Sequence, residues 1–244
     1  MDALPRQPDG PDPLDSGPER AAAVREMFDR IAPRYDALNR LLTLGLDARW
    51  RTHTAVGLAL PPGSVVIDVA CGTGMLTRAV IAAGHRAIGM DVSAGMLARA
   101  GPGLPLVRGD GLSLALGDET ADGVTCGFAL RNVVDLRALM AEMARVLRPG
   151  GRVALLEVAE PELAPARAVH RLYFQRVVPA VGGLLSDRSA YRYLPRSTVH
   201  LPDAERLGGL LEASGFTGIE RRLLGAGAAQ LLTATRRSSS APMA

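Results

Sequence analysis

Residues 64–74 read Ser-Val-Val-Ile-Asp-Val-Ala-Cys-Gly-Thr-Gly, a β-branched run that leads directly into a glycine loop. The run is typical of a buried strand, and the residues after the loop predict a helix. In an open parallel sheet, ligands bind beyond the carboxyl ends of the strands, where the free N–H groups at the start of a helix also point. The stretch therefore predicts an α/β fold with a ligand site at the glycine loop.

The spacing of the glycines distinguishes two classes of cofactor. Gly72 and Gly74 have no side chains, so a ligand can approach the backbone closely. A dinucleotide site requires G-x-G-x-x-G, and Thr77 stands where the third glycine would be. S-adenosylmethionine has no pyrophosphate and requires close approach to its amino acid and ribose, with an acid at the end of the first strand. Asp68 is that acid, and its carboxylate suits the ammonium group, so the loop favours S-adenosylmethionine over NAD.

Further strand and helix patterns alternate along the chain. An apolar helix face over 136–147 follows Asp135, a suitable N-cap, and Arg-Pro-Gly-Gly at 148–151 ends it. This alternation predicts a mostly parallel sheet with helices on both faces. Seven strands are expected in this sheet. The first is 64–69, and the other six are 87–90, 105–107, 123–128, 152–157, 218–224 and 228–235.

One domain over residues 21–236 is expected between two tails. Residues 1–20 and 237–244 are rich in Pro, Gly or Ser and are expected to be disordered. Residues 21–60 form an N-terminal helical cap, in which Pro33 interrupts a first helix and a second runs from Leu38 towards Trp50. Residues 159–200 form an insertion after the fifth strand.

Two further acids follow successive strands. Asp91 comes directly after the second expected strand, at a spacing from the loop that suits a carboxylate accepting both ribose hydroxyls. Asp110 and Gly111 come just past the third strand, where an acid can accept from the adenine amino group. A single acid at a strand end is often a solvated loop residue or a helix cap. Three of them on successive strands predict one cofactor site.

Composition limits the other classes of function. The net charge of +3 is too mild to indicate nucleic acid binding, and basic residues do not interleave with aromatics. Two cysteines, Cys71 and Cys126, do not make a disulfide framework, and the four histidines lack metal-ligand spacing, so no metal is expected. No signal peptide pattern stands at the start. We therefore expect a cytoplasmic protein.

Several segments resemble a known family. The glycine loop resembles motif I of class I methyltransferases, which have a Rossmann-like fold. Other segments resemble the quinone-biosynthesis C-methyltransferases, which act on demethylmenaquinone and on ubiquinone precursors. The resemblance spans nearly all of 24–236 and is carried by five segments: 24–39, 128–133, 147–152, 191–194 and the glycine loop.

The resemblance implies site residues and a reaction. Thr73, Asp91, Asp110 and Gly111 fall on the family's cofactor contacts, and Gly127 stands where the family often has a serine. The implied reaction transfers a methyl group from S-adenosylmethionine to a ring carbon of a prenylated quinol, demethylmenaquinol in the first place. The segment 225–231 departs from the Gly-Gly-containing ending of the best-known members, an ending that shapes the acceptor pocket. Another phenolic or secondary-metabolite acceptor is therefore the alternative.

Three residues are candidates for catalysis. Arg131 follows the fourth strand and could hold a developing phenolate, or it could be a structural ion-pair partner. Asn132 could orient the ring oxygen. Tyr35 lies in the cap, where it could close over the cofactor or pack in the core. His170, in the insertion, is better explained as structural.

A prenylated quinol resides in a bilayer, which bears on partners and location. Residues 163–185 of the insertion are apolar enough for a channel or a membrane-facing lid, or for a buried helix packed on the sheet. We expect transient contact with the inner face of the membrane and allow for a homodimer. A non-enzymatic binding protein of the same fold is the remaining alternative.

Overall fold

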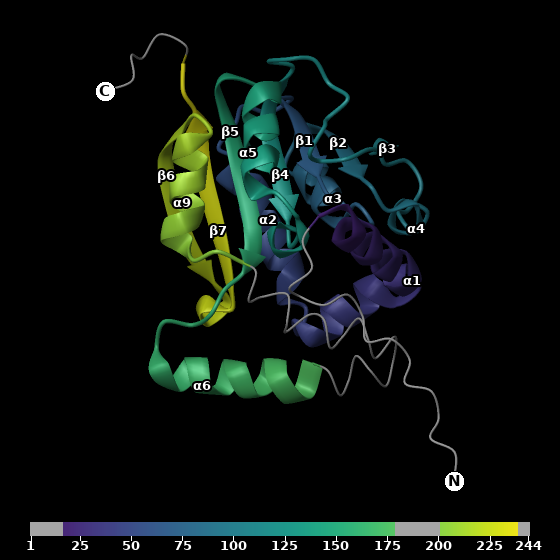
Figure 1. Ribbon diagram of the computed structural model, residues 1–244, viewed down its shortest axis with the longest axis vertical. Helices are drawn as coiled ribbons and strands as arrows, with labels where there is room; N and C mark the ends of the chain where they lie inside the picture. The colour runs from purple at the N-terminus through teal and green to yellow at the C-terminus, as the bar shows by residue number, and fades with distance from the viewer. Residues whose placement is uncertain (1–16, 179–200, 239–244) are drawn as a thin grey trace.

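A computed structural model describes residues 17–178 and 201–238 of the 244-residue chain. One seven-stranded sheet has the order β3-β2-β1-β4-β5-β7-β6, with helices on both faces (Figure 1). The strands are β1 (Val65–Val69), β2 (Arg86–Asp91), β3 (Leu106–Arg108), β4 (Ala121–Gly127), β5 (Leu147–Val158), β6 (Phe216–Leu224) and β7 (Ala229–Arg236). The α-helices are α1 (Pro18–Leu42), α2 (Leu46–Gly57), α3 (Met75–Ala82), α4 (Ala94–Leu97), α5 (Leu136–Val146), α6 (Ala164–Leu172) and α9 (Ala204–Ala213).

The strand order confirms the expected class of fold. β1 to β5 pair in parallel, whereas β7 runs antiparallel to both β5 and β6. The chain moves outward from β1 through β2 to β3 and then returns to β4 on the other side of β1. The switch point therefore lies between β1 and β4, next to the glycine loop. β5 and β6 begin at Leu147 and Phe216, earlier than expected.

Alternation along the strands builds two cores, one on each face of the sheet. Ile67 and Leu155 pack in a cluster with residues of α5 and α9. Val66 and Leu156, their neighbours in sequence, pack on the opposite face with residues of α2 and α3. Side chains of a strand point alternately to its two faces, so a strand buried on both faces is largely apolar. This explains the continuous β-branched run in β1.

The helical cap corrects one expectation. Pro33 does not interrupt the first helix, because α1 continues through it from Pro18 to Leu42. Pro33 lies on the exposed face, while the opposite stripe, which includes Met27 and Ile31, is buried in a third cluster with Met96 of α4. Packing of this stripe offsets the loss of a backbone hydrogen bond at proline. The second helix, expected over 38–50, is accordingly divided between the end of α1 and the start of α2.

The expected tails and the insertion are described only in part. Residues 18–20, assigned to the first tail, form the start of α1, and 1–16 and 239–244 lie outside the described residues. The insertion continues from α6 into a π-helical turn, η2 (Tyr173–Val177), and its residues 179–200, including the segment 191–194, lie outside them. No residue of α6 is buried, so this helix is not packed on the sheet. It lies beyond the carboxyl end of β5 (Figure 1).

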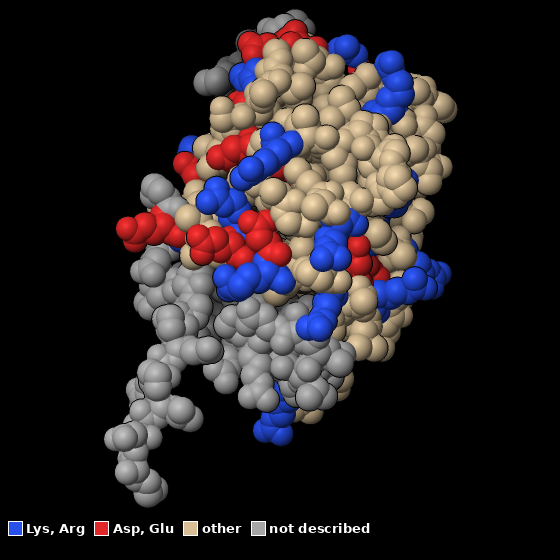
Figure 2. Space-filling model, turned by 90° about the vertical axis from the view of Figure 1, so that its right-hand side faces the viewer, with Lys and Arg blue, Asp and Glu red and all other residues tan. Residues whose placement is uncertain are grey.

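The surface carries both signs of charge. Figure 2 shows blue and red side chains next to one another on the described part of one face, between broad uncharged areas. Among the described helices, none is long and apolar enough to cross a membrane.

Candidate active site

Two adjoining cavities lie at the carboxyl ends of the parallel strands. The first, about 540 Å³, contains most of the predicted cofactor residues, and we call it the glycine-loop cavity. Its lining includes Gly72, Asp91, Asp110, Gly111, Gly127 and Asn132. The second, about 600 Å³, is lined by Arg131 and we call it the arginine cavity. Tyr35 and Phe128 line both, so the two cavities meet at these residues.

The glycine loop keeps its shape through its own backbone. Gly72 has a φ of 58°, and a Cβ built there would meet no atom within 4 Å, so its bare face opens on the cavity. Gly74 has a φ of 77°, and a Cβ there would lie 2.6 Å from Leu104 Cδ1. A side chain at Gly74 would therefore collide with its neighbour, whereas one at Gly72 would occupy the space of a ligand. Gly74 lies next to the cavity without lining it.

Asp91 joins the glycine loop to the end of β2. Its Oδ2 accepts a hydrogen bond of 2.7 Å from the Gly72 N–H, and its Oδ1 accepts one of 2.8 Å from the Ser93 N–H. Burial raises the pKa of Asp91, these two hydrogen bonds lower it, and the charge of Asp29 raises it further. Each carboxylate oxygen can accept more than one hydrogen bond. Asp91 can therefore hold the loop and accept from ligand hydroxyls together.

Asp110 and Gly111 form the opposite wall. Asp110 is exposed, and its Oδ1 accepts a hydrogen bond of 2.9 Å from the Leu112 N–H. A Cβ at Gly111 would lie 2.9 Å from Val69 Cγ1, so this loop packs closely on the end of β1. Gly72, Asp91 and Asp110 therefore converge on one cavity, as the sequence predicts.

Asp68 lies beneath the loop and lines neither cavity. Its side chain is fully buried and accepts hydrogen bonds from the hydroxyls of Thr77 (2.6 Å) and Thr125 (2.8 Å). The expected contact with the ammonium group of the ligand is therefore corrected to a role in fixing α3 and β4 to β1. Burial raises the pKa of this carboxyl to about 6, against the two hydroxyl hydrogen bonds. Thr77, which breaks the dinucleotide pattern, thus acts here as a donor.

Two aspartates of α1, which sequence reasoning did not assign, attach the cap to the sheet. Asp36 Oδ1 accepts a hydrogen bond of 2.7 Å from the Thr73 hydroxyl, so Thr73 faces the cap and does not line the cavity. Asp29 Oδ1 accepts from the Ser93 hydroxyl and, at 2.8 Å, from the Gly95 N–H. The two aspartates are seven residues apart and share a helix face. Acids at this spacing are the signal that could have revealed them.

Gly127 ends β4, and Phe128 begins the turn that follows it. A Cβ at Gly127 would lie 3.1 Å from Leu76 Cδ2, which leaves little room for the serine of the family pattern. Phe128 has a φ of 58°, which is rare for a bulky residue and marks a site held by its surroundings. Its N–H donates to the Leu156 carbonyl at 2.7 Å. Phe128 is thereby held at the junction of the two cavities.

Arg131 lies in the short 3-10 turn after β4 and is both an ion-pair partner and a cavity residue. Its guanidinium pairs with the carboxylate of Glu157, whose side chain is 0% exposed. Glu157 Oε1 also accepts from the Val158 N–H at 2.9 Å. The Arg131 carbonyl accepts from the guanidinium of Arg20, near the start of α1, at 3.3 Å. The adjacent Asn132 lines the other cavity, so the turn serves both.

A second guanidinium lines the arginine cavity. Arg51 pairs with Asp47 one turn earlier in α2, and its Cζ lies 5.8 Å from the centre of the Phe128 ring. The Thr43 hydroxyl donates to Asp47 Oδ1 at 3.0 Å. Sequence reasoning did not assign Arg51 or Asp47, although acid and base four residues apart around Trp50 offered a signal.

Residues of the cap and of the insertion complete the arginine cavity. Tyr35 is half-buried. Its ring packs edge-on against the ring of Phe28, with 5.9 Å between the two ring centres. His170 and Tyr173 line the cavity, as expected for the insertion, and the Tyr173 hydroxyl donates to the Leu42 carbonyl at 2.8 Å. Burial lowers the pKa of His170. The insertion and the cap therefore meet at the mouth of this cavity.

Comparison with known proteins identifies the family. The profile of the ubiE/COQ5 methyltransferase family matches residues 16–236. The chain belongs to this family. A demethylmenaquinone methyltransferase of Roseiflexus sp. (strain RS-1) is 42% identical to this methyltransferase over 231 residues, which cover 90% of this chain and 95% of the relative. The ubiquinone/menaquinone biosynthesis C-methyltransferase UbiE of Syntrophotalea carbinolica is 40% identical over 222 residues, 87% and 94% of the two chains.

Solved structures share the fold of this methyltransferase. A possible histamine N-methyltransferase of Thermotoga maritima has a TM-score of 0.63 at 17% identity, over 88% of this chain and 100% of its own. Phosphoethanolamine N-methyltransferase 2 of Haemonchus contortus, solved with S-adenosyl-L-methionine, has a TM-score of 0.57 at 14% identity, over 88% of this chain and 60% of its own. The fold is the Rossmann-like fold of S-adenosylmethionine-dependent methyltransferases.

The residues of the glycine-loop cavity fit S-adenosylmethionine. Gly72 leaves open space beside the loop, and the carboxylates of Asp91 and Asp110 can accept from ribose hydroxyls and from an amino group. Tyr35, Phe128 and Asn132 bound the side towards the arginine cavity. The sulfonium carries a methyl group, and a second substrate in the arginine cavity would meet it at Tyr35 and Phe128.

We expect Asp91→Asn to weaken cofactor binding. The substitution removes the charge but keeps one acceptor oxygen, and hydrogen bonds to a charged group contribute about 1.5 to 3 kcal/mol. The dissociation constant for S-adenosylhomocysteine, measured by calorimetry, should therefore rise roughly 10- to 100-fold. Asp203→Asn is the matched control, because asparagine can still cap α9 and Asp203 lines neither cavity. A normal dissociation constant for Asp91→Asn would contradict this site.

We expect the buried Asp68 to make stability fall as pH rises. The folded protein binds its proton more tightly than the unfolded chain, so the favourable contribution is full below pH 3.8 and is lost as pH rises through about 6. The free energy of unfolding of Asp68→Asn minus that of the wild type should increase by about 3 kcal/mol across this interval. Urea denaturation at a series of pH values measures the difference. If the difference in unfolding free energy between Asp68→Asn and the wild type does not change with pH, the pKa of Asp68 is not raised by burial.

Proposed function

We propose that this methyltransferase transfers the methyl group of S-adenosylmethionine to a ring carbon of a prenylated quinol, with demethylmenaquinol as the first candidate. The observation that carries the proposal is the arginine cavity, which adjoins the cofactor site and combines two guanidinium groups with a largely apolar wall. Trp50, Phe128 and Val169 contribute apolar surface, while Arg51 and Arg131 contribute charge. A hydroquinone ring with an isoprenoid tail has this same combination of two polar oxygens and an apolar body.

Arg131 supports the reaction by stabilising negative charge on the quinol. The quinol gives up a hydroxyl proton to water, and its ring carbon would then form the new C–C bond while the bond between the methyl group and sulfur breaks, with S-adenosylhomocysteine as the leaving group. The ring carbon then loses its own hydrogen as a proton and the ring oxygen regains one from water, so that one proton is released overall. A guanidinium has five N–H donors, so Arg131 can bind Glu157 and a developing oxyanion together. Glu157 fixes the orientation of Arg131 before the substrate binds. S-adenosylmethionine supplies an electrophilic methyl group when bound, and alignment is the main requirement.

The junction of the cavities sets that alignment. Phe128 and Tyr35 line both cavities, so the acceptor ring reaches the methyl group only between these two side chains. Asn132, on the cofactor side, can orient a ring oxygen. A smaller phenol would contact the junction but leave the apolar part of the arginine cavity unfilled, and it is the alternative acceptor.

The proposed acceptor is tested with S-adenosylmethionine labelled in its methyl group. Wild-type enzyme should transfer label to demethylmenaquinol and much more slowly to water-soluble phenols. Arg131→Lys keeps a positive charge for Glu157, so folding and cofactor binding should persist, while kcat falls about 10- to 100-fold because lysine lacks the planar fork.

Arg148→Lys is the control for that assay. Arg148 forms a half-exposed ion pair with Asp122 outside both cavities, and its substitution should leave kcat unchanged. Faster transfer to soluble phenols than to demethylmenaquinol would favour the alternative acceptor. A normal kcat for Arg131→Lys would contradict a role for Arg131 in the reaction.

We also propose that the protein docks on the membrane through the mouth of the arginine cavity. Exposed apolar side chains surround this mouth on the turn between α1 and α2 and on α6. Leu44 is 80% exposed and Val169 is 69% exposed, and both line the cavity. Leu163 and Leu172 extend the same apolar surface along α6. Large exposed apolar side chains beside a cavity for a lipid-soluble substrate suit insertion into the headgroup region.

Vesicle binding tests this docking. The double variant Leu163→Glu and Leu172→Glu leaves the cavity lining intact and should reduce co-sedimentation with phosphatidylglycerol vesicles. Its KM for quinol in vesicles should rise, while its rate with a short-chain soluble quinol should stay normal. Val56→Glu is the control, because Val56 is 65% exposed but lines neither cavity. Wild-type binding by the double variant would contradict docking through α6.

A further inference from the structure

The connection between β3 and β4 carries one wall of the cofactor site without support from a regular helix or strand. It contributes Gly109, Asp110, Gly111 and Leu112 to the glycine-loop cavity. A segment of this kind has high conformational entropy when it is not held, and every ligand that needs it in one shape then binds less tightly. What holds the connection therefore affects cofactor affinity.

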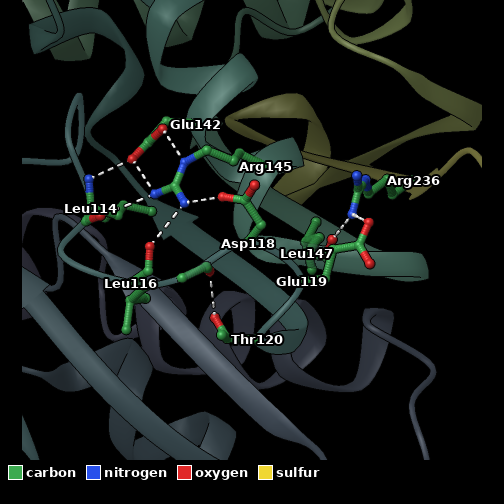
Figure 3. Close-up of polar contacts among 10 residues, drawn as sticks. Leu114, Leu116, Asp118, Glu119, Thr120, Glu142, Arg145, Leu147 and Arg236 are labelled. Carbon is green, nitrogen blue, oxygen red and sulfur yellow. Dashed lines mark hydrogen bonds and ion pairs between the residues drawn. The ribbon is translucent and has the colours of Figure 1, made fainter.

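Arg145 of α5 holds this connection with its whole guanidinium group (Figure 3). Its Nη1 donates to the Leu116 carbonyl at 2.8 Å and to Asp118 Oδ1 at 2.6 Å. Its Nη2 donates to the Leu114 carbonyl at 3.0 Å and to Glu142 Oε1 at 2.7 Å, and its Nε donates to Glu142 Oε2 at 2.8 Å. A guanidinium has five N–H donors, and these five bonds employ all of them.

Glu142 completes the contact from the same helix. Its Oε1 accepts a hydrogen bond of 2.7 Å from the Leu114 N–H, so both backbone groups of Leu114 are bound to the Glu142 and Arg145 pair. The hydrogen bond from Arg145 is the main cause that lowers the pKa of Glu142. The Leu114 side chain is buried in the core next to Leu139 of α5. The pair thus fixes the path of the backbone as well as one side chain.

The clamped residues adjoin the cavity residues directly. The Ser113 N–H donates to the Asp110 carbonyl at 3.1 Å, and the Leu112 N–H donates to Asp110 Oδ1. The turn that orients Asp110 therefore ends one residue before Leu114. A fixed Leu114 therefore anchors one end of that turn, in addition to the contact of Gly111 with Val69 at the end of β1.

We propose that Arg145, together with Glu142, is a positioning residue for the adenine end of the cofactor, acting through the 109–118 connection. An isolated ion pair at the surface contributes little. This pair differs because three of its six hydrogen bonds go to the backbone of the connection. The inference rests on the cofactor site and is independent of the identity of the methyl acceptor.

Two ligands that differ only at the base test the proposal. Arg145→Met keeps the apolar stem but removes every donor, and its dissociation constant for S-adenosylhomocysteine should rise about tenfold, equivalent to about 1.4 kcal/mol. S-inosylhomocysteine lacks the amino group that Asp110 would bind, so its affinity should fall much less. The preference for the adenosyl ligand should therefore shrink. Arg145→Lys should not restore the affinity for S-adenosylhomocysteine, because an ammonium group cannot reach all five acceptors.

Arg236→Met is the matched control. Arg236 pairs with Glu119 and donates to the Leu147 carbonyl in the same region, but it makes no contact within 109–118 among the described residues (Figure 3). Calorimetry well below each melting temperature should give wild-type dissociation constants for both ligands with this variant. An equal loss of affinity for both ligands in Arg145→Met would reduce Arg145 to a merely structural role. Unchanged affinity for both would overturn the proposal altogether.

Discussion

The Asp91 carboxylate is the contact on which the site depends. Its two oxygens bind the backbone N–H groups of Gly72 and Ser93, which belong to different loops. One buried charge therefore sets the separation between the glycine loop and the end of β2, where the ribose of the cofactor would lie. Burial makes this charge costly, and the two backbone donors offset that cost. The same group can thus be both scaffold and ligand contact.

In the arginine cavity the charged groups are cations, and each of them is also held by a partner within the protein. Arg51 and Arg131 are each paired with a carboxylate of the protein, so the arginine cavity is close to neutral before a substrate enters. A ligand that enters without net charge suits such a cavity, and the guanidinium groups can still stabilise negative charge that develops on it later. Removing either carboxylate would leave a buried cation uncompensated, which is strongly destabilising. A substitution of Glu157 would therefore affect both folding and turnover. A substitution that keeps the positive charge opposite Glu157, such as Arg131→Lys, can affect turnover while the protein still folds.

Sequence patterns predicted the sheet because a parallel strand buried on both faces is mostly apolar, as β1 is apart from Asp68. They also predicted that Asp91, Asp110 and Arg131 lie near one another, since strand ends in such a sheet meet at one edge, and these residues line the two adjoining cavities. They misplaced Asp68, because the partners of its carboxylate, Thr77 of α3 and Thr125 of β4, depend on how these elements pack on β1 and leave no local pattern. They misread Pro33, because a local rule cannot anticipate a buried stripe on the opposite helix face. The contacts of Arg145 with Leu114, Leu116 and Asp118 link segments distant in sequence and leave no local pattern.

The two aspartates of α1 have a consequence for both cavities. Asp36 is bound to the glycine loop, and Asp29 is bound to the turn before α4, so α1 cannot tilt without breaking polar contacts next to the cofactor. Tyr35 sits between these two attachments and belongs to both cavities. A displacement of α1 that broke these contacts would therefore disturb the walls of both cavities at once. The glycine-loop cavity and the arginine cavity are thus mechanically linked, because one helix supplies part of the wall of each.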